Sequence, residues 1–145
     1  MAHPGIDFPG VGSGLAVLND GKLLLCKRLK APEAGHWSIV GGKVDHMEPA
    51  ADAARREAEE ESGLTIHSAR FLCLSEQRVE ADRQHWVSLI YVTDDFSGEV
   101  RLMEPDKLSE IGWYALDDLP QPLSVFAQDA VKALKAQAIP AVQHT

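Results

Sequence analysis

The segment GKVDHMEPAADAARREAEEESGL, from Gly42 to Leu64, carries most of the information about the fold of this chain. It predicts a helix from Pro49 to Ser62, because proline suits the first helical position and the interior is rich in Ala, Arg and Glu. Gly63 stands where a helix C-cap belongs. Small residues on one side of this helix favour close packing on a sheet; they are Ala50, Ala51, Ala54 and Ala58.

Apolar runs on both sides of this helix predict strands. Asp20-Gly21 is a hairpin-turn signal between the first two runs. We expect strands at Gly14–Leu18, Leu23–Arg28, Leu64–Ser75 and His85–Thr93, and a further pair at Glu99–Met103 and Gly112–Leu116. Trp37–Val44 contains a short apolar stretch broken by Gly41-Gly42, where the backbone must bend or approach something closely. Glu76–Gln84 is expected to be a polar connection, and Leu123–Ala136 an amphipathic helix. Strands around two helices predict an α/β fold with a mixed sheet between helical layers.

Length and composition indicate one ordinary globular domain. The chain has 145 residues, of which 45% are hydrophobic and 25% charged. Its net charge of −8 disfavours a nucleic-acid polymer as a partner, since phosphate binding needs a basic face. Neither a membrane span nor a signal segment is apparent, so we expect a cytoplasmic protein without a membrane partner. Cys26 and Cys73 lie in separate apolar runs and are expected to be buried, reduced thiols.

Three carboxylates share one face of the predicted central helix. Glu57, Glu60 and Glu61 stand at i, i+3 and i+4, so their Cβ atoms are about 5–6 Å apart. Taken alone, such a trio usually forms a solvated acidic face. A hard divalent cation would offset the repulsion, and oxygen-only ligands suit Mg²⁺ or Mn²⁺, which commonly also bind phosphate oxygens. The trio therefore also points to phosphorylated substrates.

The wider pattern resembles the Nudix box, G-x5-E-x7-R-E-U-x-E-E-x-G-U, in which U is apolar. Every fixed letter is present: Gly42, Glu48, Arg56, Glu57, Glu60, Glu61 and Gly63. The resemblance implies a single Nudix hydrolase domain over residues 1–145, with an α/β/α sandwich around a mixed β-sheet. It also implies hydrolysis of a nucleoside diphosphate linked to another moiety, with Mg²⁺ or Mn²⁺ required as cofactor.

The same resemblance implies roles for individual residues. The box carboxylates would bind the metal, with Glu48 either acting through water or bracing its loop. Arg56 would orient the carboxylates, and Gly41 and Gly42 would let the backbone pass close to the substrate diphosphate. A metal-activated water would then attack phosphorus. The expected metal ligands are Glu57, Glu60, Glu61 and Glu48.

Two expected site residues lie outside the box. Glu104 is our first choice for a catalytic acid contributed by a loop, whereas Glu57 is the alternative general base. Three other glutamates compete with Glu104 for that place: Glu76, Glu80 and Glu110. Arg28, at the end of a predicted strand, resembles a position that contacts phosphate in MutT-type members, with an ordinary surface arginine as the alternative.

Markers after the box favour the MutT-type branch of this family. These are Gln84-His85-Trp86-Val87, Glu104-Pro105, Trp113 and Leu119-Pro120. They predict hydrolysis of an NTP or dNTP to the nucleoside monophosphate and pyrophosphate. ADP-ribose or a nucleotide sugar is the alternative substrate, and a non-catalytic nucleotide sensor is the alternative class. An RNA-cap hydrolase is disfavoured by the net charge, and a homodimer stays open. The three tryptophans are expected in the core, with stacking on a nucleobase as the alternative.

Overall fold

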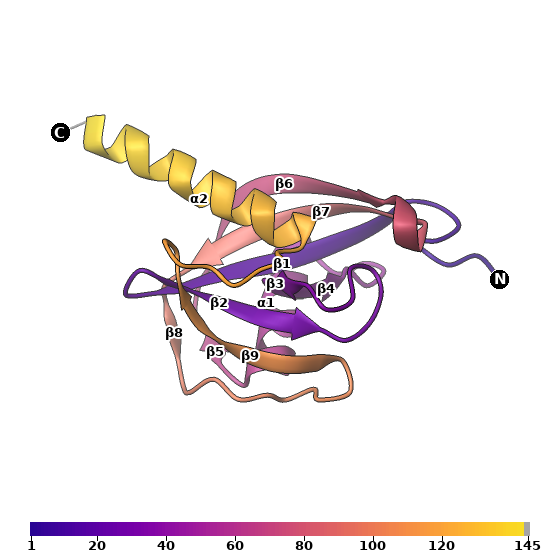
Figure 1. The fold of residues 1–145 in the computed structure, drawn as a ribbon, viewed down its shortest axis with the longest axis horizontal. Coiled ribbons are helices and arrows are strands. Elements are labelled where there is room, and N and C mark those ends of the chain that lie inside the picture. The colour runs from indigo at the N-terminus through magenta and orange to yellow at the C-terminus, as the bar shows by residue number, and fades with distance from the viewer. Residues whose placement is uncertain (144–145) are drawn as a thin grey trace.

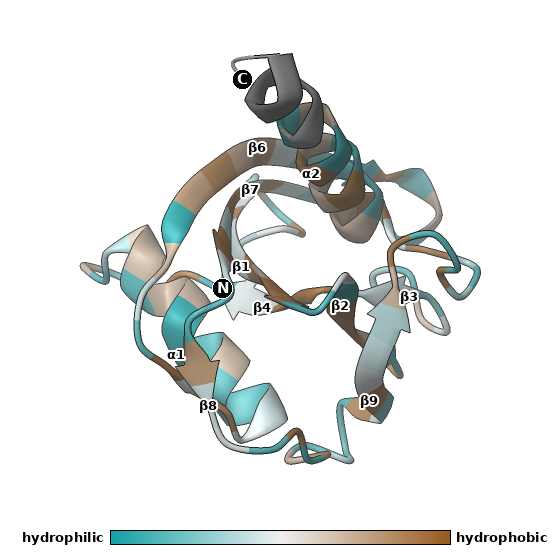
Figure 2. Cartoon of the chain, turned by 90° about the vertical axis from the view of Figure 1, so that its left-hand side faces the viewer, coloured by the Kyte–Doolittle hydropathy of each residue, from teal (hydrophilic) through white to brown (hydrophobic). Residues whose placement is uncertain are grey.

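The computed structural model describes the backbone of residues 1–143 and the side chains of residues 1–137. A seven-stranded mixed sheet lies between two long helices, as predicted (Figures 1 and 2). Its strands are β1 (Gly10–Asn19), β2 (Lys22–Arg28), β3 (Trp37–Ser38), β4 (Val40–Lys43), β6 (Arg70–Val79), β7 (Gln84–Thr93) and β9 (Leu108–Ala115). A separate two-stranded sheet consists of β5 (Thr65–Ile66) and β8 (Phe96–Ser97). The helices are α1 (Ala50–Ser62), a short 3-10 turn η1 (Glu80–Asp82) and α2 (Val125–Gln143).

Strand β1 is the centre of the large sheet. It pairs antiparallel with β2 and β4 and parallel with β7, while β6 continues the sheet beyond β7. Asp20-Gly21 forms the expected turn between β1 and β2, with both residues at positive φ.

Alternation along the strands gives the sheet two buried faces. Ala16 and its neighbours on one face pack with Ala127 and Ala130 of α2. Leu15 and Val17 on the other face pack with the α1 alanines Ala54 and Ala58. Figure 2 shows α1 and α2 on opposite sides of the strands. Because successive strand residues point to opposite faces, the near-continuous apolar run of β1 serves both cores.

Helix α1 differs slightly from the prediction at its start. Pro49 has the expected φ of −62° but an extended ψ of 139°, so it is the N-cap and the helix begins at Ala50. Gly63 ends the helix in the left-handed region at φ 77°, and its N–H donates to the carbonyl oxygen of Glu59.

Several predicted boundaries are wrong. Glu99–Met103 is not a strand, so it does not form the predicted pair with Gly112–Leu116. The strand in that second region is β9, and it pairs with β2. The N–H groups of Arg101 and Met103 are used elsewhere, since they donate to the carbonyl oxygens of Ser62 and Glu61 at the end of α1. The segment Glu76–Gln84 is also not a simple polar connection, since most of it belongs to β6 and to the η1 turn. Its polar residue Gln77 is buried, which the sequence pattern did not indicate.

The cysteines are both free thiols, as expected. Cys26 is buried, whereas Cys73 is only partly buried, which departs from the prediction. Among the described residues, no helix is both long enough and apolar enough to cross a membrane.

Candidate active site

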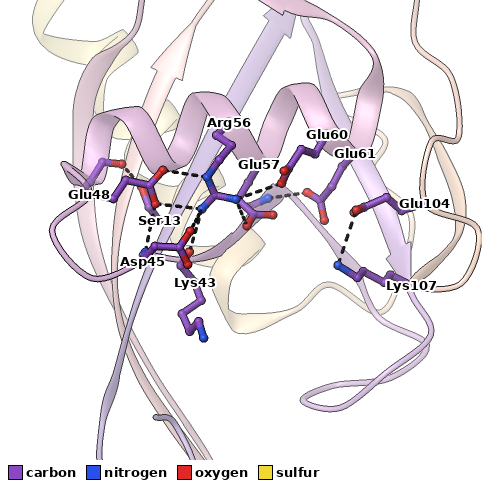
Figure 3. Close-up of polar contacts among 12 residues, drawn as sticks. Ser13, Lys43, Asp45, Glu48, Arg56, Glu57, Glu60, Glu61, Glu104 and Lys107 are labelled. Carbon is purple, nitrogen blue, oxygen red and sulfur yellow. Dashed lines mark hydrogen bonds and ion pairs between the residues drawn. The ribbon is translucent and has the colours of Figure 1, made fainter. Parts of the chain in front are cut away.

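Arg56 of α1 lies at the centre of a cluster of carboxylates (Figure 3). Its Nε and Nη2 donate to the two oxygens of Glu48 at 2.8 and 3.0 Å. Its Nη1 donates to Oε1 of Glu57 at 2.9 Å and to Oε1 of Glu60 at 3.0 Å. The planar guanidinium thus holds three carboxylates at once, a geometry that a lysine cannot reproduce. The hydrogen bonds from Arg56, together with the one that Glu48 accepts from the Asp45 N–H, lower the pKa of Glu48 to about 2.

Glu61 is tied to the neighbouring strand and withdrawn from water. Its side chain is only 7% exposed, and its Oε1 accepts a hydrogen bond from the N–H of Gly41 at 2.8 Å. Burial raises the pKa of Glu61 to about 8 against the opposing effect of that bond, and the charges of Glu57 and Glu104 contribute in the same direction. Burial and the two neighbouring carboxylates thus oppose the ionisation of Glu61.

Glu57 lies against the glycine pair of β4. A Cβ added to Gly42 would lie 2.5 Å from Cδ of Glu57, so glycine is what lets the carboxylate approach the strand. A Cβ on Gly41 would point to the other side, 2.7 Å from the carbonyl oxygen of Ser13. Burial also raises the pKa of Glu57, partly offset by Arg56.

The segment after β8 brings Glu104 to these carboxylates. The bonds from the Arg101 and Met103 N–H groups to the end of α1 fix its path. Oε1 of Glu104 is buried and has no hydrogen-bond partner within the described part of the chain. Its Oε2 lies 3.6 Å from Nζ of Lys107 (Figure 3). Of the competing glutamates, Glu76 is instead bonded to His85, Glu80 begins the η1 turn, and Glu110 lies in β9.

A cavity of about 270 Å³ opens beside β4. Arg28, Gly41, Gly42 and Lys43 contribute to its wall. Nε of Arg28 donates to the carbonyl oxygen of Pro32 at 2.7 Å, which fixes the guanidinium at this edge. The cationic side chains of Arg28 and Lys43 at this edge suit a phosphorylated ligand.

The donor set fits a hard divalent cation. It consists of carboxylate oxygens, which are the ligands that such cations prefer. Oε1 of Glu104 is buried without a hydrogen-bond partner among the described residues, and the side chain of Glu61 is withdrawn from water. In this structure no three His, Cys, Asp or Glu side chains of the described residues stand ready as a complete metal cluster. Arg56 supplies the counter-charge to three of the carboxylates, which are Glu48, Glu57 and Glu60.

Sequence reasoning did not assign the aromatic walls of the cavity to the site. Trp86, expected in the core, lines the cavity together with Phe126 of α2. The signal that could have found them is Gly10-x-Gly12-x-Gly14, three glycines on one side of a single strand.

Comparison with known proteins identifies the family. The NUDIX domain family matches residues 9–135, and the chain therefore belongs to the Nudix hydrolase family. A MutT NUDIX hydrolase from Burkholderia pseudomallei is 47% identical, with a TM-score of 0.83 over 86% of this chain and 97% of that one. The fold is accordingly the Nudix α/β/α sandwich, as the sequence predicted. This family generally uses divalent metal ions.

Two curated relatives differ in the substrates that their names give. An ADP-ribose pyrophosphatase from Methanocaldococcus jannaschii is 29% identical over 82% of this chain and 66% of its own length. An oxidized purine nucleoside triphosphate hydrolase from Danio rerio is 31% identical over 72% of this chain and 65% of its own length. The chain thus spans slightly less than two thirds of each of these relatives.

Proposed function

We propose that this chain is a Mg²⁺- or Mn²⁺-dependent pyrophosphohydrolase that converts an NTP or dNTP to the nucleoside monophosphate and pyrophosphate. The observation that carries the proposal is the convergence of Glu57, Glu61 and Glu104 beside a cavity whose edge carries Arg28 and Gly41-Gly42. The site would lie in one domain spanning residues 1–145.

The proposed ligands are the carboxylates of Glu57, Glu60 and Glu61, supported by Glu48. Hydrogen bonds from the protein engage Oε1 of each of the three helix carboxylates, and Glu57, Glu60 and Glu61 would hold the cation through their remaining acceptor capacity. A bound cation supplies charge neutralisation on the phosphates and makes a bound water more acidic. Arg56 orients the carboxylates and holds the loop of Glu48 against α1.

The residues of the chain itself account for the remaining steps. Arg28 binds and orients the phosphates, and Gly41 and Gly42, which carry no side chain, let the phosphates lie close to strand β4. Glu104 accepts a proton from the attacking water, because its Oε1 is free of other bonds, whereas Arg56 occupies Oε1 of Glu57. A new P–O bond forms between that water oxygen and one phosphorus of the α–β linkage, the bridging P–O bond breaks, and the group on the other phosphorus leaves with the electron pair.

Two observations support a triphosphate substrate over the alternatives. The MutT-type markers after the box are present, and the solved structure at 47% identity is described as a MutT protein. ADP-ribose is the second candidate, favoured by the name of the archaeal relative. A non-catalytic sensor is less consistent with the chain, because every box carboxylate is retained.

A product-resolved hydrolysis panel tests this proposal. Normal and oxidised NTPs and dNTPs, ADP-ribose and nucleotide sugars would be compared in Mg²⁺ and in Mn²⁺. We expect monophosphate and pyrophosphate from triphosphates, with kcat reduced about 100-fold or more in Glu104→Gln if that residue is the base. Cleavage of ADP-ribose alone would overturn the substrate, and an unchanged kcat in Glu104→Gln would overturn the assignment of the base.

A further inference from the structure

Three glycines of β1 shape the floor of the cavity. Gly10, Gly12 and Gly14 alternate along the strand and therefore face the same side of the sheet. A Cβ added to them would lie 2.4 Å from Cζ3 of Trp86, 2.5 Å from Oγ of Ser88 and 2.3 Å from Cζ of Phe126, respectively. Each glycine thus makes room for one side chain of the cavity lining to lie directly on the strand.

The two aromatic rings are fixed walls. Trp86 is held by the N-terminal segment, where a Cβ on Gly5 would lie 2.3 Å from Cζ2 of the ring. Its Nε1 donates to Oε1 of Gln84 at 2.9 Å. Phe126 comes from α2 and also contacts Gly41, where a Cβ would lie 3.1 Å from Cε2. Rigid aromatic walls favour a flat heteroaromatic ligand such as a nucleobase.

A buried chain of hydrogen bonds runs from α2 to the cavity. Oγ of Ser75 donates to Oδ2 of Asp129 at 2.6 Å, and Nε2 of Gln77 donates to Oγ of Ser75 at 2.6 Å. Oγ of Ser88 donates to Oε1 of Gln77 at 3.0 Å. Ser75, Gln77 and Ser88 are 2%, 6% and 3% exposed. Gln77 and Ser88 line the cavity, whereas Ser75 and Asp129 do not.

The carboxylate of Asp129 determines which group donates and which accepts in each of these hydrogen bonds. An ionised carboxylate only accepts, so the single hydroxyl proton of Ser75 is directed to Asp129. Ser75 must then accept from the side-chain nitrogen of Gln77, which leaves the Gln77 oxygen to accept from Ser88. Asp129 therefore determines which end of the Gln77 amide is the donor.

A fixed amide in a cavity wall can read a base. Gln77 keeps one N–H and one lone pair beyond these bonds, and Ser88 keeps the acceptor capacity of its oxygen. Exchanging a keto for an amino group on the ligand would place donor against donor or acceptor against acceptor. Such a mismatch leaves buried polar groups unpaired, which is how binding sites achieve strong discrimination.

We propose that Gln77 distinguishes bases that differ by exchange of keto and amino groups, and that Asp129 is the positioning residue that orients it through Ser75. The proposal rests on the proposed function in taking the ligand to be a nucleotide. It assigns to α2, which lies across β6 in Figure 1, a role in substrate selection.

The test is equilibrium binding by calorimetry, which needs no turnover. The probes are IMP against AMP and UMP against CMP, since the two bases of each pair differ by exchange of one keto and one amino group, with the ring N–H that accompanies it. We expect the wild type to prefer one member of at least one pair by about tenfold or more. In Asp129→Asn the amide can donate to Ser75, which releases Gln77 to flip, so the preference should fall towards unity while the average affinity changes little.

Ser75→Ala interrupts the same series of hydrogen bonds at a different residue, so the preference should again fall towards unity. The matched control is Asp95→Asn, because Ser68 donates to Oδ2 of Asp95 in an exposed Ser–Asp pair that does not line the cavity. A wild type that binds both members of each pair equally, or binds no nucleotide, would overturn the inference. So would an unchanged preference in both Asp129→Asn and Ser75→Ala.

The outcome is separable from that of the proposed function. Hydrolysis of triphosphates without any base preference would overturn only the inference. Base-selective binding that depends on Asp129, without hydrolysis, would support the inference and overturn the proposed pyrophosphohydrolase.

Discussion

The backbone N–H of Gly41 donates to Oε1 of Glu61 at 2.8 Å, and this bond joins the edge of the cavity to the acidic helix. Gly41 faces Phe126 and its neighbour Gly42 faces Glu57, so strand β4 separates the proposed base site from the proposed metal site. A nucleotide that crosses β4 would place its phosphates next to the α1 carboxylates.

Gly42→Ala should disable the site without unfolding the protein. The new Cβ would lie 2.5 Å from Cδ of Glu57, so the carboxylate must move away from its position against β4. We expect kcat to fall about 10-fold or more, since small displacements of catalytic groups are costly. The control is Gly112→Ala, whose Cβ would meet only ordinary contacts with Tyr114, the nearest at 3.7 Å. Equal activity of the two variants in a steady-state assay would contradict the prediction.

Metal-free stability should fall as the pH rises towards 8. The pKa of Glu61 is raised by burial to about 8 from an ordinary value of 4.5. Between these values the folded chain retains a proton that the unfolded chain releases, so the free energy of unfolding decreases with pH. We expect a loss of about 3–4 °C in Tm per pH unit in EDTA across this window.

Glu61→Gln removes this titration and should flatten the dependence of Tm on pH. Added Mg²⁺ should raise the Tm of the wild type above pH 7, because a ligand that binds only the folded state stabilises it. Parallel pH profiles for the wild type and Glu61→Gln, measured by thermal unfolding in EDTA, would show that Glu61 is not the cause.

Arg56→Lys should behave as a disruptive substitution. Lysine keeps the charge but cannot donate to Glu48, Glu57 and Glu60 with the planar geometry seen here. We expect a decrease in kcat of about 10- to 100-fold and weaker Mn²⁺ binding. Arg55→Lys is a suitable control, because Arg55 donates to the carbonyl oxygen of Ile66 through a single nitrogen. The prediction fails if both variants retain wild-type turnover.

The two cysteines should react with iodoacetamide at different rates. Burial raises the pKa of Cys26 far above its ordinary value, and the thiol is 2% exposed. Burial also raises the pKa of Cys73, but this side chain is only partly buried. Because the thiolate is the nucleophile, we expect Cys73 to be alkylated first in the native protein and both after unfolding. Peptide mapping after timed alkylation measures the order, and faster labelling of Cys26 would refute it.

The parts of the molecule that follow from local chemistry could be predicted from the sequence. Pro49, the alanines and Gly63 define α1 almost to the residue, and Asp20-Gly21 defines the first hairpin. The path of Glu99–Met103 could not be read in the same way. It depends on carbonyl groups at the end of α1, which are distant in sequence and offer bonds that replace those of a strand.

The same distinction between local and tertiary causes applies to the site. The spacing of Glu57, Glu60 and Glu61 follows from helix geometry alone, and their proximity on one face needs no tertiary information. The Gln77 chain could not be found from the sequence, because a polar residue in a strand gives no sign that its partners are Ser75, Ser88 and an aspartate of α2. Burial of that chain is a property of how α2 packs on β6.

The most direct test of the account is the Mg²⁺-dependent turnover of a triphosphate by Glu60→Gln and Glu59→Gln. These variants remove neighbouring charges from the same helix, but Glu59 accepts a hydrogen bond from the N–H of Ile66, which glutamine can still accept. The account predicts that Glu60→Gln loses about 100-fold or more in kcat and that Glu59→Gln stays within about threefold of the wild type. Full activity of Glu60→Gln would contradict it.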